Sequence, residues 1–172
     1  ALMIAVFYIL EVKMKFNKEI FIAVIFFLLL AAFPFLKYLH GEYKKSHFAC
    51  LANYSAINND NVFVSNNSLI INGANGTWMM DGKISYPNSE PLFFKLRNNF
   101  SVERTKFSYH FHSKRVSIIP SETSYGPKLS EFLADVIINE NKDSFFYIYP
   151  AGEDYLIYSG AMPIMYCMKK DN

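Results

Sequence analysis

The stretch Ile20–Leu36 reads IFIAVIFFLLLAAFPFL and divides the chain into a short amino-terminal segment and a longer carboxyl-terminal one. Its seventeen residues include no charge, no hydroxyl group and no amide side chain. As an α-helix the stretch would extend about 25 Å, at the short end of the length that crosses the hydrocarbon core of a bilayer. A helix on the surface of a soluble domain needs a polar face, and this stretch has none. We therefore predict that residues 20–36 insert into a membrane.

Two kinds of membrane segment fit this stretch. A cleaved signal peptide would use the lysines before it as the basic region, and Ala31 and Ala32 as the small residues near the cleavage site. An uncleaved anchor explains why the apolar run continues past those alanines to Leu36. We adopt the anchor as the working interpretation. The buried core helix of a soluble protein is the third alternative.

The chain contains two cysteines, Cys50 and Cys167, which bracket the carboxyl-terminal part. We expect them to form one disulfide, which requires an oxidising compartment. The bridge would close a loop of about 117 residues and stabilise the fold by about 4–5 kcal/mol. Two unrelated buried thiols are the alternative. Because the lysines on the two sides of the apolar stretch balance, only the disulfide orients it, with the amino-terminal segment in the cytoplasm.

Four parts of the chain follow from these features. Residues 1–19 form a cytoplasmic segment, 20–36 a transmembrane helix, 37–47 a juxtamembrane linker and 48–172 a periplasmic domain, which is long enough for one core. The run Met14–Lys18 is typical of the start of a bacterial export signal. We therefore expect residues 1–13 to lie upstream of the natural start.

Charge and motifs favour a binding protein. The net charge is only +2 and the basic residues are scattered, which argues against direct binding of nucleic acid. The sequence contains no nucleophile elbow, P-loop, dinucleotide fingerprint or zinc-protease motif. Two distant cysteines without paired histidines make no recognisable metal site. We expect a protein without enzymatic activity, cofactor or metal.

The segment 105–119 carries the clearest strand pattern. Phe107, Tyr109 and Phe111 alternate with polar residues, and the alternation continues through Ser113 to Arg115. A period of two predicts a half-buried strand. We expect the three aromatic side chains to face the core.

Other elements follow from shorter patterns. Strands are expected at residues 62–64, 68–71, 76–86, 92–103, 144–149 and 155–159. Turns or bulges are expected at 58–61, 66–67, 72–73, 81–82 and 150–154. Apolar residues at helical spacing predict one soluble helix over 128–139. The expected fold class is α+β: an N-terminal transmembrane helix followed by a mainly antiparallel β-sheet domain with one helix.

Two histidines on the polar face of the strand 105–119 are candidates for pH sensing. His110 and His112 lie two residues apart and so share that face, where protonation would add like charge beside Lys106 and Lys114. His47 is a third candidate. The alternative is that exposed strand histidines have no role.

The strand 144–149 carries apolar residues on both faces, because it includes the run FFYIY at 145–149. Its residues Phe145, Tyr147 and Tyr149 are candidates for an interface with a partner. The alternative is a strand that is simply buried on both faces.

Several short segments resemble those of a known family. They are Cys50 soon after a single span, GTWMMDGKI at residues 76–84, the region from Leu96 to Tyr109, and PIMYC at 163–167. Together they resemble the FidL-like proteins of enterobacteria, and among these the MyfF–PsaF group that accompanies fimbrial-operon regulators in Yersinia. The resemblance covers Cys50 to Cys167 and the anchor. The histidine pair and the asparagine-rich loops have no match in it.

The resemblance implies a role like that of ToxS. Such a protein sits in the bacterial inner membrane, and its periplasmic domain forms a heterodimer with that of a membrane-bound winged-helix transcription activator. It would protect the activator from proteolysis and help it respond to a cue, and an apolar chamber would accept a small apolar ligand. The alternative function is a secreted or anchored module for ligand binding or fimbrial assembly, with a lipocalin-like β domain.

Overall fold

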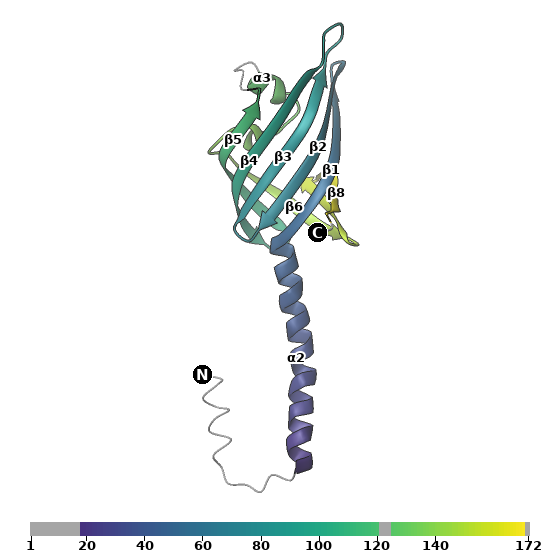
Figure 1. The fold of residues 1–172 in the computed structure, drawn as a ribbon, viewed down its shortest axis with the longest axis vertical. Helices are drawn as coiled ribbons and strands as arrows, with labels where there is room; N and C mark the ends of the chain where they lie inside the picture. Colours follow the sequence, from purple (N-terminus) through teal and green to yellow (C-terminus); the bar gives the residue numbers. More distant parts are fainter. Residues whose placement is uncertain (1–17, 121–124, 171–172) are drawn as a thin grey trace. The chain divides into compact units, whose positions relative to one another are not determined.

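The computed structural model describes residues 18–120 and 125–170 (Figure 1). The chain divides into two compact units, with the boundary between Tyr43 and Lys44. The helix α2 (Lys18–Ser46) forms the described part of the first unit and ends within the second. The second unit is a β-barrel.

The helix α2 contains the predicted apolar stretch. Its segment Phe21–Ser46 is long and apolar enough to cross a membrane, and a signal sequence near the amino terminus would share these properties. The residues expected as a linker are helical up to Ser46. Lys44 and Lys45 in the last turn favour this extension, because cations interact well with the negative end of the helix dipole. The expected natural start at Met14 lies outside the described residues.

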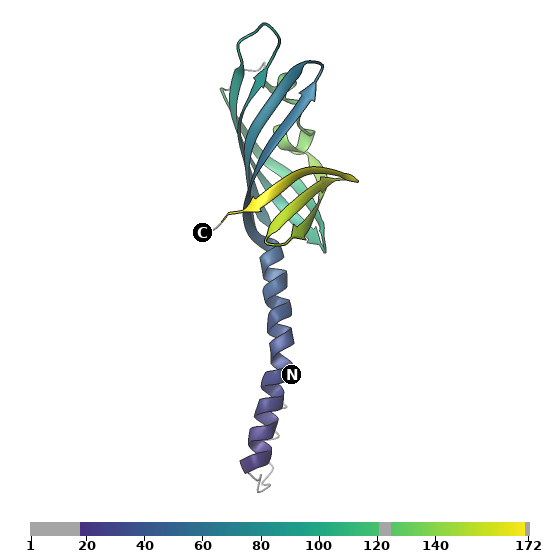
Figure 2. The same cartoon turned by 90° about the vertical axis from the view of Figure 1, so that its right-hand side faces the viewer.

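Eight antiparallel strands close into a barrel in which each strand pairs with its neighbours in sequence and β8 returns to β1 (Figures 1 and 2). The expectation of an apolar N-terminal helix followed by an antiparallel β domain is confirmed. The closed barrel is more specific than that expectation, because closure needs β1 and β8, which the sequence did not predict. The strands are β1 (His47–Asn58), β2 (Asn61–Asn72), β3 (Asn75–Ser85), β4 (Leu92–Thr105), β5 (Ser108–Ile119), β6 (Asp143–Ala151), β7 (Asp154–Ser159) and β8 (Met162–Lys169).

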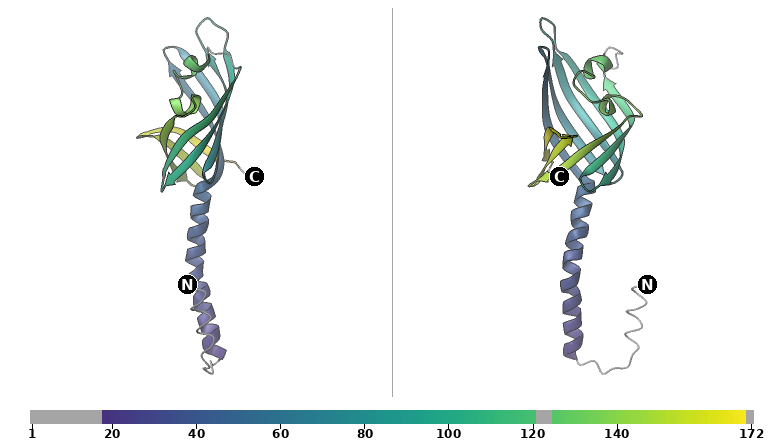
Figure 3. Two further views of the ribbon diagram at one scale, coloured as in Figure 1. Left: turned by 90° about the vertical axis from the view of Figure 1, so that its left-hand side faces the viewer. Right: turned by 180° about the vertical axis from the view of Figure 1, so that it is seen from behind.

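The barrel has a long-strand half, β1–β5, and a short-strand half, β6–β8. The long strands contain 11 to 14 residues and the short ones 6 to 9. The halves meet at two short seams, since β5 and β6 share five residue pairs and β1 and β8 share two. The connection from β5 to β6 contains the short helices α3 (Tyr125–Leu129) and α4 (Asp135–Ile138), which lie beside the upper part of the long strands (Figure 3).

The prediction of one helix over 128–139 is wrong, because α3 and α4 are separate. The carbonyl oxygens of Val136 and Ile137 in the short helix α4 accept hydrogen bonds of 2.6 and 3.1 Å from the buried Asn98 side chain. Leu129, Leu133 and the apolar residues of α4 are buried. Contacts with the barrel interior therefore override the local helical pattern.

Three of the predicted turns are confirmed. Gly73 and Gly152 have positive φ angles of 62° and 69° in the turns after β2 and β6. Asn59 and Asp60 adopt the same left-handed region between β1 and β2, which suits asparagine and aspartate.

The turns or bulges predicted at 66–67 and 81–82 are wrong, because both pairs lie within continuous strands. Asn67 is buried, and its amide nitrogen donates to Ser65. Gly82 serves close packing, since a Cβ there would lie 2.5 Å from the Val64 carbonyl oxygen and 3.0 Å from the ring of Phe94.

The alternation predicted for 105–119 is correct for its centre and wrong at both ends. Tyr109, Phe111 and Ser113 are buried. Phe107 lies in the turn before β5 and is 38% exposed, so it does not build the core. The β4–β5 register shifts between Asn99 and Phe100, which leaves Lys114 as an extra residue on β5. Arg115, which follows it, is therefore exposed. One extra residue at such a bulge exchanges the two faces of a strand.

The predicted disulfide is present and joins β1 to β8. Cys50 and Cys167 are fully buried and their Cα atoms lie 5.4 Å apart. Beside the bridge, the strands share only two residue pairs and a hydrogen bond of 2.9 Å from the Lys170 nitrogen to the Ala49 oxygen. The disulfide therefore fastens the seam that closes the barrel.

Candidate functional site

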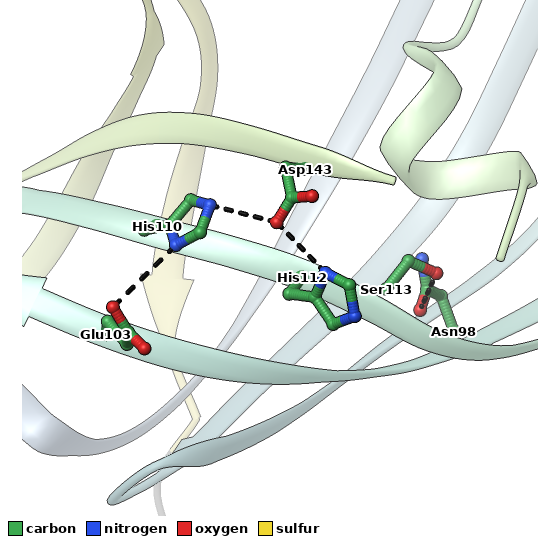
Figure 4. A network of polar contacts seen from close by, with 6 residues as sticks. All are labelled: Asn98, Glu103, His110, His112, Ser113 and Asp143. Carbon is green, nitrogen blue, oxygen red and sulfur yellow. Dashed lines mark hydrogen bonds and ion pairs between the residues drawn. The ribbon is translucent and has the colours of Figure 1, made fainter. Parts of the chain in front are cut away.

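His110 and His112 lie on the outer face of β5 beside Asp143, the first residue of β6 (Figure 4). The Oδ1 atom of Asp143 lies 3.0 Å from His110 Nε2 and 2.9 Å from His112 Nδ1. The carboxylate of Glu103 on β4 lies 3.9 Å from His110 Nδ1. The two imidazoles therefore share one carboxylate oxygen.

Strand register builds this histidine cluster. The β5–β6 pairing places His112 opposite Asp143, and the β4–β5 pairing places His110 opposite Glu103. We expected lysines beside the histidines, but the charged groups that contact them are these carboxylates. Protonation converts each contact into an ion pair. The charged groups in contact with the two imidazoles are therefore acidic, and not the lysines that the sequence suggested.

His47 lies on another strand than the histidine cluster. It begins β1, whose neighbours in the barrel are β2 and β8, and its Nδ1 atom lies 2.9 Å from Ser46 Oγ. Strand pairing therefore does not place His47 beside the pair on β5, and its role in pH sensing stays a prediction.

The three interface candidates on β6 point outward. Phe145 is 57% exposed, Tyr147 36% and Tyr149 39%, whereas Phe146 and Ile148 between them are buried. The alternative of a strand buried on both faces is therefore wrong for this chain. The ring of His110 stacks on Phe145 with 4.7 Å between ring centres. The histidine cluster thus contacts the apolar face of β6.

Cross-strand neighbours extend this face over the short-strand half. Tyr149 lies opposite Leu156 and Leu156 opposite Tyr166, while Tyr147 lies opposite Tyr158. The β1–β8 pairing continues the face to the first strand, and the ring of Phe107 lies 5.2 Å from that of Tyr149. We call this set the outer aromatic surface: Leu51, Phe107, Phe145, Tyr147, Tyr149, Leu156, Tyr158, Tyr166 and Met168.

Such a surface is unusual on an antiparallel sheet with one face toward the solvent, where outward residues are commonly polar. The outer face of the neighbouring strands β3 and β4 follows that rule more closely, with Asp81, Lys83, Lys95 and Arg97 between single apolar residues. Contiguous exposed apolar patches mark sites of interaction with proteins, ligands or membranes. The short-strand half therefore offers a candidate binding face.

Asp154 fixes part of the outer aromatic surface. The Tyr166 hydroxyl donates a hydrogen bond to its carboxylate, and the Lys169 backbone nitrogen donates another at 2.9 Å. The bond from Tyr166, followed by that from Lys169, holds the pKa of Asp154 below its usual value. The same bond raises the pKa of Tyr166. This pair holds the Tyr166 hydroxyl beside the start of β7.

A buried polar network lies inside the barrel and was not predicted. The Ser113 hydroxyl donates to Asn98 Oδ1 at 3.1 Å (Figure 4). The Asn98 amide nitrogen donates to the two α4 carbonyls. The indole nitrogen of Trp78 donates to Asn67 Oδ1 at 3.4 Å. The polar residues of this network, Asn67, Asn98 and Ser113, lie at inward positions of their strands. These positions can be identified only when the register of the strands is known.

Sequence reasoning also missed the carboxylates of the histidine cluster. Asp143 lies 31 residues from His112, and the predicted strand began one residue after it. Among residues 18–120 and 125–170, no group of three His, Cys, Asp or Glu side chains could hold a metal ion. Comparisons of the chain with protein-family models, curated proteins and solved structures found no match. The functional conclusions below therefore depend on the sequence and on this geometry.

Proposed function

We propose that this protein is an anchored co-regulator of the bacterial inner membrane. Its barrel would lie in the periplasm, form a heterodimer with a membrane-bound winged-helix transcription activator of fimbrial genes, and stabilise it. The observation that carries the proposal is the outer aromatic surface, which the described residues of the chain leave exposed or half-buried. The identity of the partner comes from the sequence resemblance to the FidL-like proteins and the MyfF–PsaF group.

The composition of the outer aromatic surface suits a protein partner. Tyrosine, phenylalanine and methionine are enriched at protein interfaces, where rigid aromatic side chains bury a large area at a low cost in conformational entropy. An anchor in the same membrane confines the partner and raises its effective concentration, so that a modest surface is sufficient. Binding would favour one state of the activator, and a cue acts by changing the affinity for that state.

Acidity is the cue that the histidine cluster supports. His110 lies between Asp143, Glu103 and the ring of Phe145, so its protonation state affects a residue of the proposed interface. A His110→Gln, His112→Gln variant would lose the change in partner affinity that the wild type has between about pH 7.5 and 5.5. An unchanged pH response in this variant contradicts the role of the histidines.

Co-purification with the activator of its own operon tests the proposal. A Tyr147→Ser, Tyr149→Ser variant should bind at least about tenfold more weakly, because buried aromatic anchors at interfaces contribute about 1–2 kcal/mol or more each. The matched control is Val64→Ser, Met79→Ser on the long-strand half, whose parent residues have the same exposures of 39% and 36%. The proposal fails if the full-length protein captures no activator, or if both variants bind equally.

A second candidate function is a ligand-binding module. Closed antiparallel barrels of eight strands include the lipocalins, which hold one small ligand. The interior of this barrel is instead filled by side chains that are less than 2% exposed, among them Phe63, Trp78, Phe94, Phe111 and Phe146. A small apolar ligand would have to displace them. Mass spectrometry of the protein extracted from its native membrane tests this function, which requires a co-purifying apolar molecule.

A further inference from the structure

Basic side chains that are far apart in the sequence gather at the end of the barrel where β1 begins. They come from the last turn of α2, the turn between β4 and β5, and the end of β8. The residues from Lys44 onward belong to the barrel unit, so this arrangement is internal to that unit. We call this set the basic end: Lys44, Lys45, Arg104, Lys106, Lys169 and Lys170.

Specific contacts bring the segments of the basic end together. The Lys170 nitrogen donates a hydrogen bond of 2.9 Å to the Ala49 oxygen, which places the end of β8 beside the start of β1 (Figure 2). The Tyr109 hydroxyl donates to the Lys45 oxygen at 2.8 Å, and the Lys45 ammonium group lies 5.7 Å from the centre of the Phe107 ring. These contacts fix the last turn of α2 against the turn between β4 and β5.

Carboxylates accompany the basic end but do not neutralise it. The acidic residues of the same region are Glu103 on β4 and Glu153–Asp154 in the turn between β6 and β7. The exposed lysines Lys44, Lys106 and Lys170 form no ion pair within the part of the chain that the structure describes. The basic end therefore keeps a positive charge.

The opposite end of the barrel is mainly acidic. Its turns, with the described connection between β5 and β6, carry Asp60, Glu90, Glu131, Asp135 and Glu140 against Lys128 and Lys142. The charge of the unit is thus polarised along the barrel, although the net charge of the whole chain is only +2. A negatively charged surface would attract a domain with this polarity by its basic end.

Lys106 has a backbone conformation that does not suit lysine. Its φ angle is 56°, in the left-handed region that glycine and asparagine adopt more readily. The Arg104 side chain donates a hydrogen bond of 3.0 Å to the Lys106 oxygen and so closes the turn. Residues in such conformations cluster at functional sites, where the rest of the structure holds them in place. The Lys106 side chain is therefore a candidate for contact with a negatively charged ligand.

The position of the basic end in the chain brings it close to a membrane that contains α2. The apolar stretch ends at Leu36, and the helix continues without a break through Lys44. Along a helix, the step between these two residues is about 12 Å. The headgroup layer on each side of a bilayer is about 5–8 Å thick, and charges interact over about 8–10 Å at physiological ionic strength. Lys44 is therefore within range of the lipid headgroups in the anchored state.

We propose that the basic end binds the anionic phospholipid headgroups of the membrane in which α2 is anchored. The lysine ammonium groups would contact the lipid phosphates as point charges, while Arg104 keeps the turn of Lys106 closed. This contact would orient the barrel on the bilayer and restrict the directions in which the outer aromatic surface can meet its partner. The inference rests on the anchor of the function proposed above, but not on the identity of the activator.

Hydrogen exchange of the full-length protein in nanodiscs tests this inference. One set of nanodiscs contains phosphatidylcholine alone, and the other an equal mixture of phosphatidylcholine and phosphatidylglycerol, which is the anionic probe. Exchange over residues 105–108 should be at least about fivefold slower in the anionic nanodiscs, the factor expected from one lysine near an anionic surface. About 1 M salt should abolish the difference by screening. The turn at 58–61, at the acidic end, should exchange equally in both.

A charge variant tests the lysines of the basic end and preserves the fold. Lys106→Asn, Lys170→Gln should lose the slowing that depends on the anionic lipid. Its unfolding midpoint should equal or exceed that of the wild type, because asparagine suits the left-handed conformation at position 106. The matched control is Lys83→Gln, Lys114→Gln, which removes the same charge from exposed positions elsewhere on the barrel and should behave like the wild type.

The outcomes separate the inference from the function on which it rests. If the turn exchanges equally in the two lipid mixtures, or if the charge variant and its control lose the slowing equally, the inference is wrong while the proposed function stands. Slowing that appears only after the activator is added, in either mixture, overturns the assignment to lipid, because the basic end would then bind the protein partner. If protein extracted from its native membrane lacks residues 1–32 by intact-mass measurement, the anchor is wrong and both proposals fail.

Discussion

The two halves of the barrel differ in what holds them and in what they expose. The long-strand half consists of five strands with extensive pairing, and α4 packs against its β4 and β5. The short-strand half meets it through two short seams, one of which has a disulfide beside it. It also carries apolar side chains on both faces. In the function proposed above, the long strands would form the scaffold and the short strands would present the surface for the partner.

The largest expected effect concerns the inward face of β6. Phe146 is 1% exposed and packs against Trp78 and Phe111, with 5.7 and 5.0 Å between ring centres. Phe146→Ala should lower the free energy of unfolding by about 3–5 kcal/mol, because it leaves a cavity. Phe145→Ala, one residue earlier on the outward face, should change it by less than about 0.5 kcal/mol. Urea unfolding followed by the fluorescence of Trp78 measures both, and equal losses would contradict the assignment of the faces.

Removal of the disulfide should separate the stabilities of the two halves. A Cys50→Ala, Cys167→Ala variant should lose about 2–5 kcal/mol. Hydrogen exchange should then accelerate first in β6–β8, because their remaining seams are short, and later in β2–β4. Wild-type protein treated with reductant under mild denaturation is the control and should show the same order. Uniform acceleration over the barrel would mean that the halves unfold as one unit.

The polar network tests how the connection with α4 is attached to the long-strand half. Asn98→Ala would leave the buried carbonyls of Val136 and Ile137 without their donor, at a cost of about 1–3 kcal/mol. Hydrogen exchange should increase over residues 129–142 more than in β2 and β3. The matched control is Asn66→Ala, at an exposed position of β2, which should leave both measurements unchanged. An identical exchange pattern in the two variants would show that packing alone holds α4.

The smallest expected effect is a change in acid stability from Asp154. Hydrogen bonds from Tyr166 and Lys169 lower the pKa of its carboxyl from the ordinary value of 3.8. The carboxylate therefore stabilises the fold above about pH 4, and this contribution is lost as the pH falls through the lowered pKa of the folded state. Tyr166→Phe should make the loss of stability below about pH 4 less steep. Unfolding midpoints between about pH 2 and 6 measure it, with Tyr158→Phe as the control.

Sequence patterns identified the elements whose evidence is local. The apolar run in α2, the cysteine pair and the centre of β5 all depend on composition or on a period of two. Patterns failed where one residue changes the outcome, as at the bulge beside Lys114, which exposes Arg115. They also failed for β1 and β8, whose pairing joins residues more than a hundred positions apart. The two cysteines indicated that these segments meet, but no local signal showed that they are paired strands.

The candidate site shows the same division. The outward direction of Phe145, Tyr147 and Tyr149 follows from alternation, but their exposure depends on the absence of any described element over the short strands. The histidine pair was visible in the sequence, whereas its carboxylate partners became evident only when strand register placed Asp143 and Glu103 beside it.

By itself, the sequence determined that an apolar helix precedes a β domain with two bracketing cysteines and aromatic strands. Residue type and short-range periodicity encode these properties. Apolar side chains are transferred favourably out of water, and the backbone geometry of helices and strands decides which spacing of such side chains forms one face. Only the tertiary structure decided that the sheet closes, that the disulfide fastens the closing seam, and that one edge of β1 stays open. These features depend on which strands meet and over what length, and that is a balance of long-range pairing and packing across the whole domain.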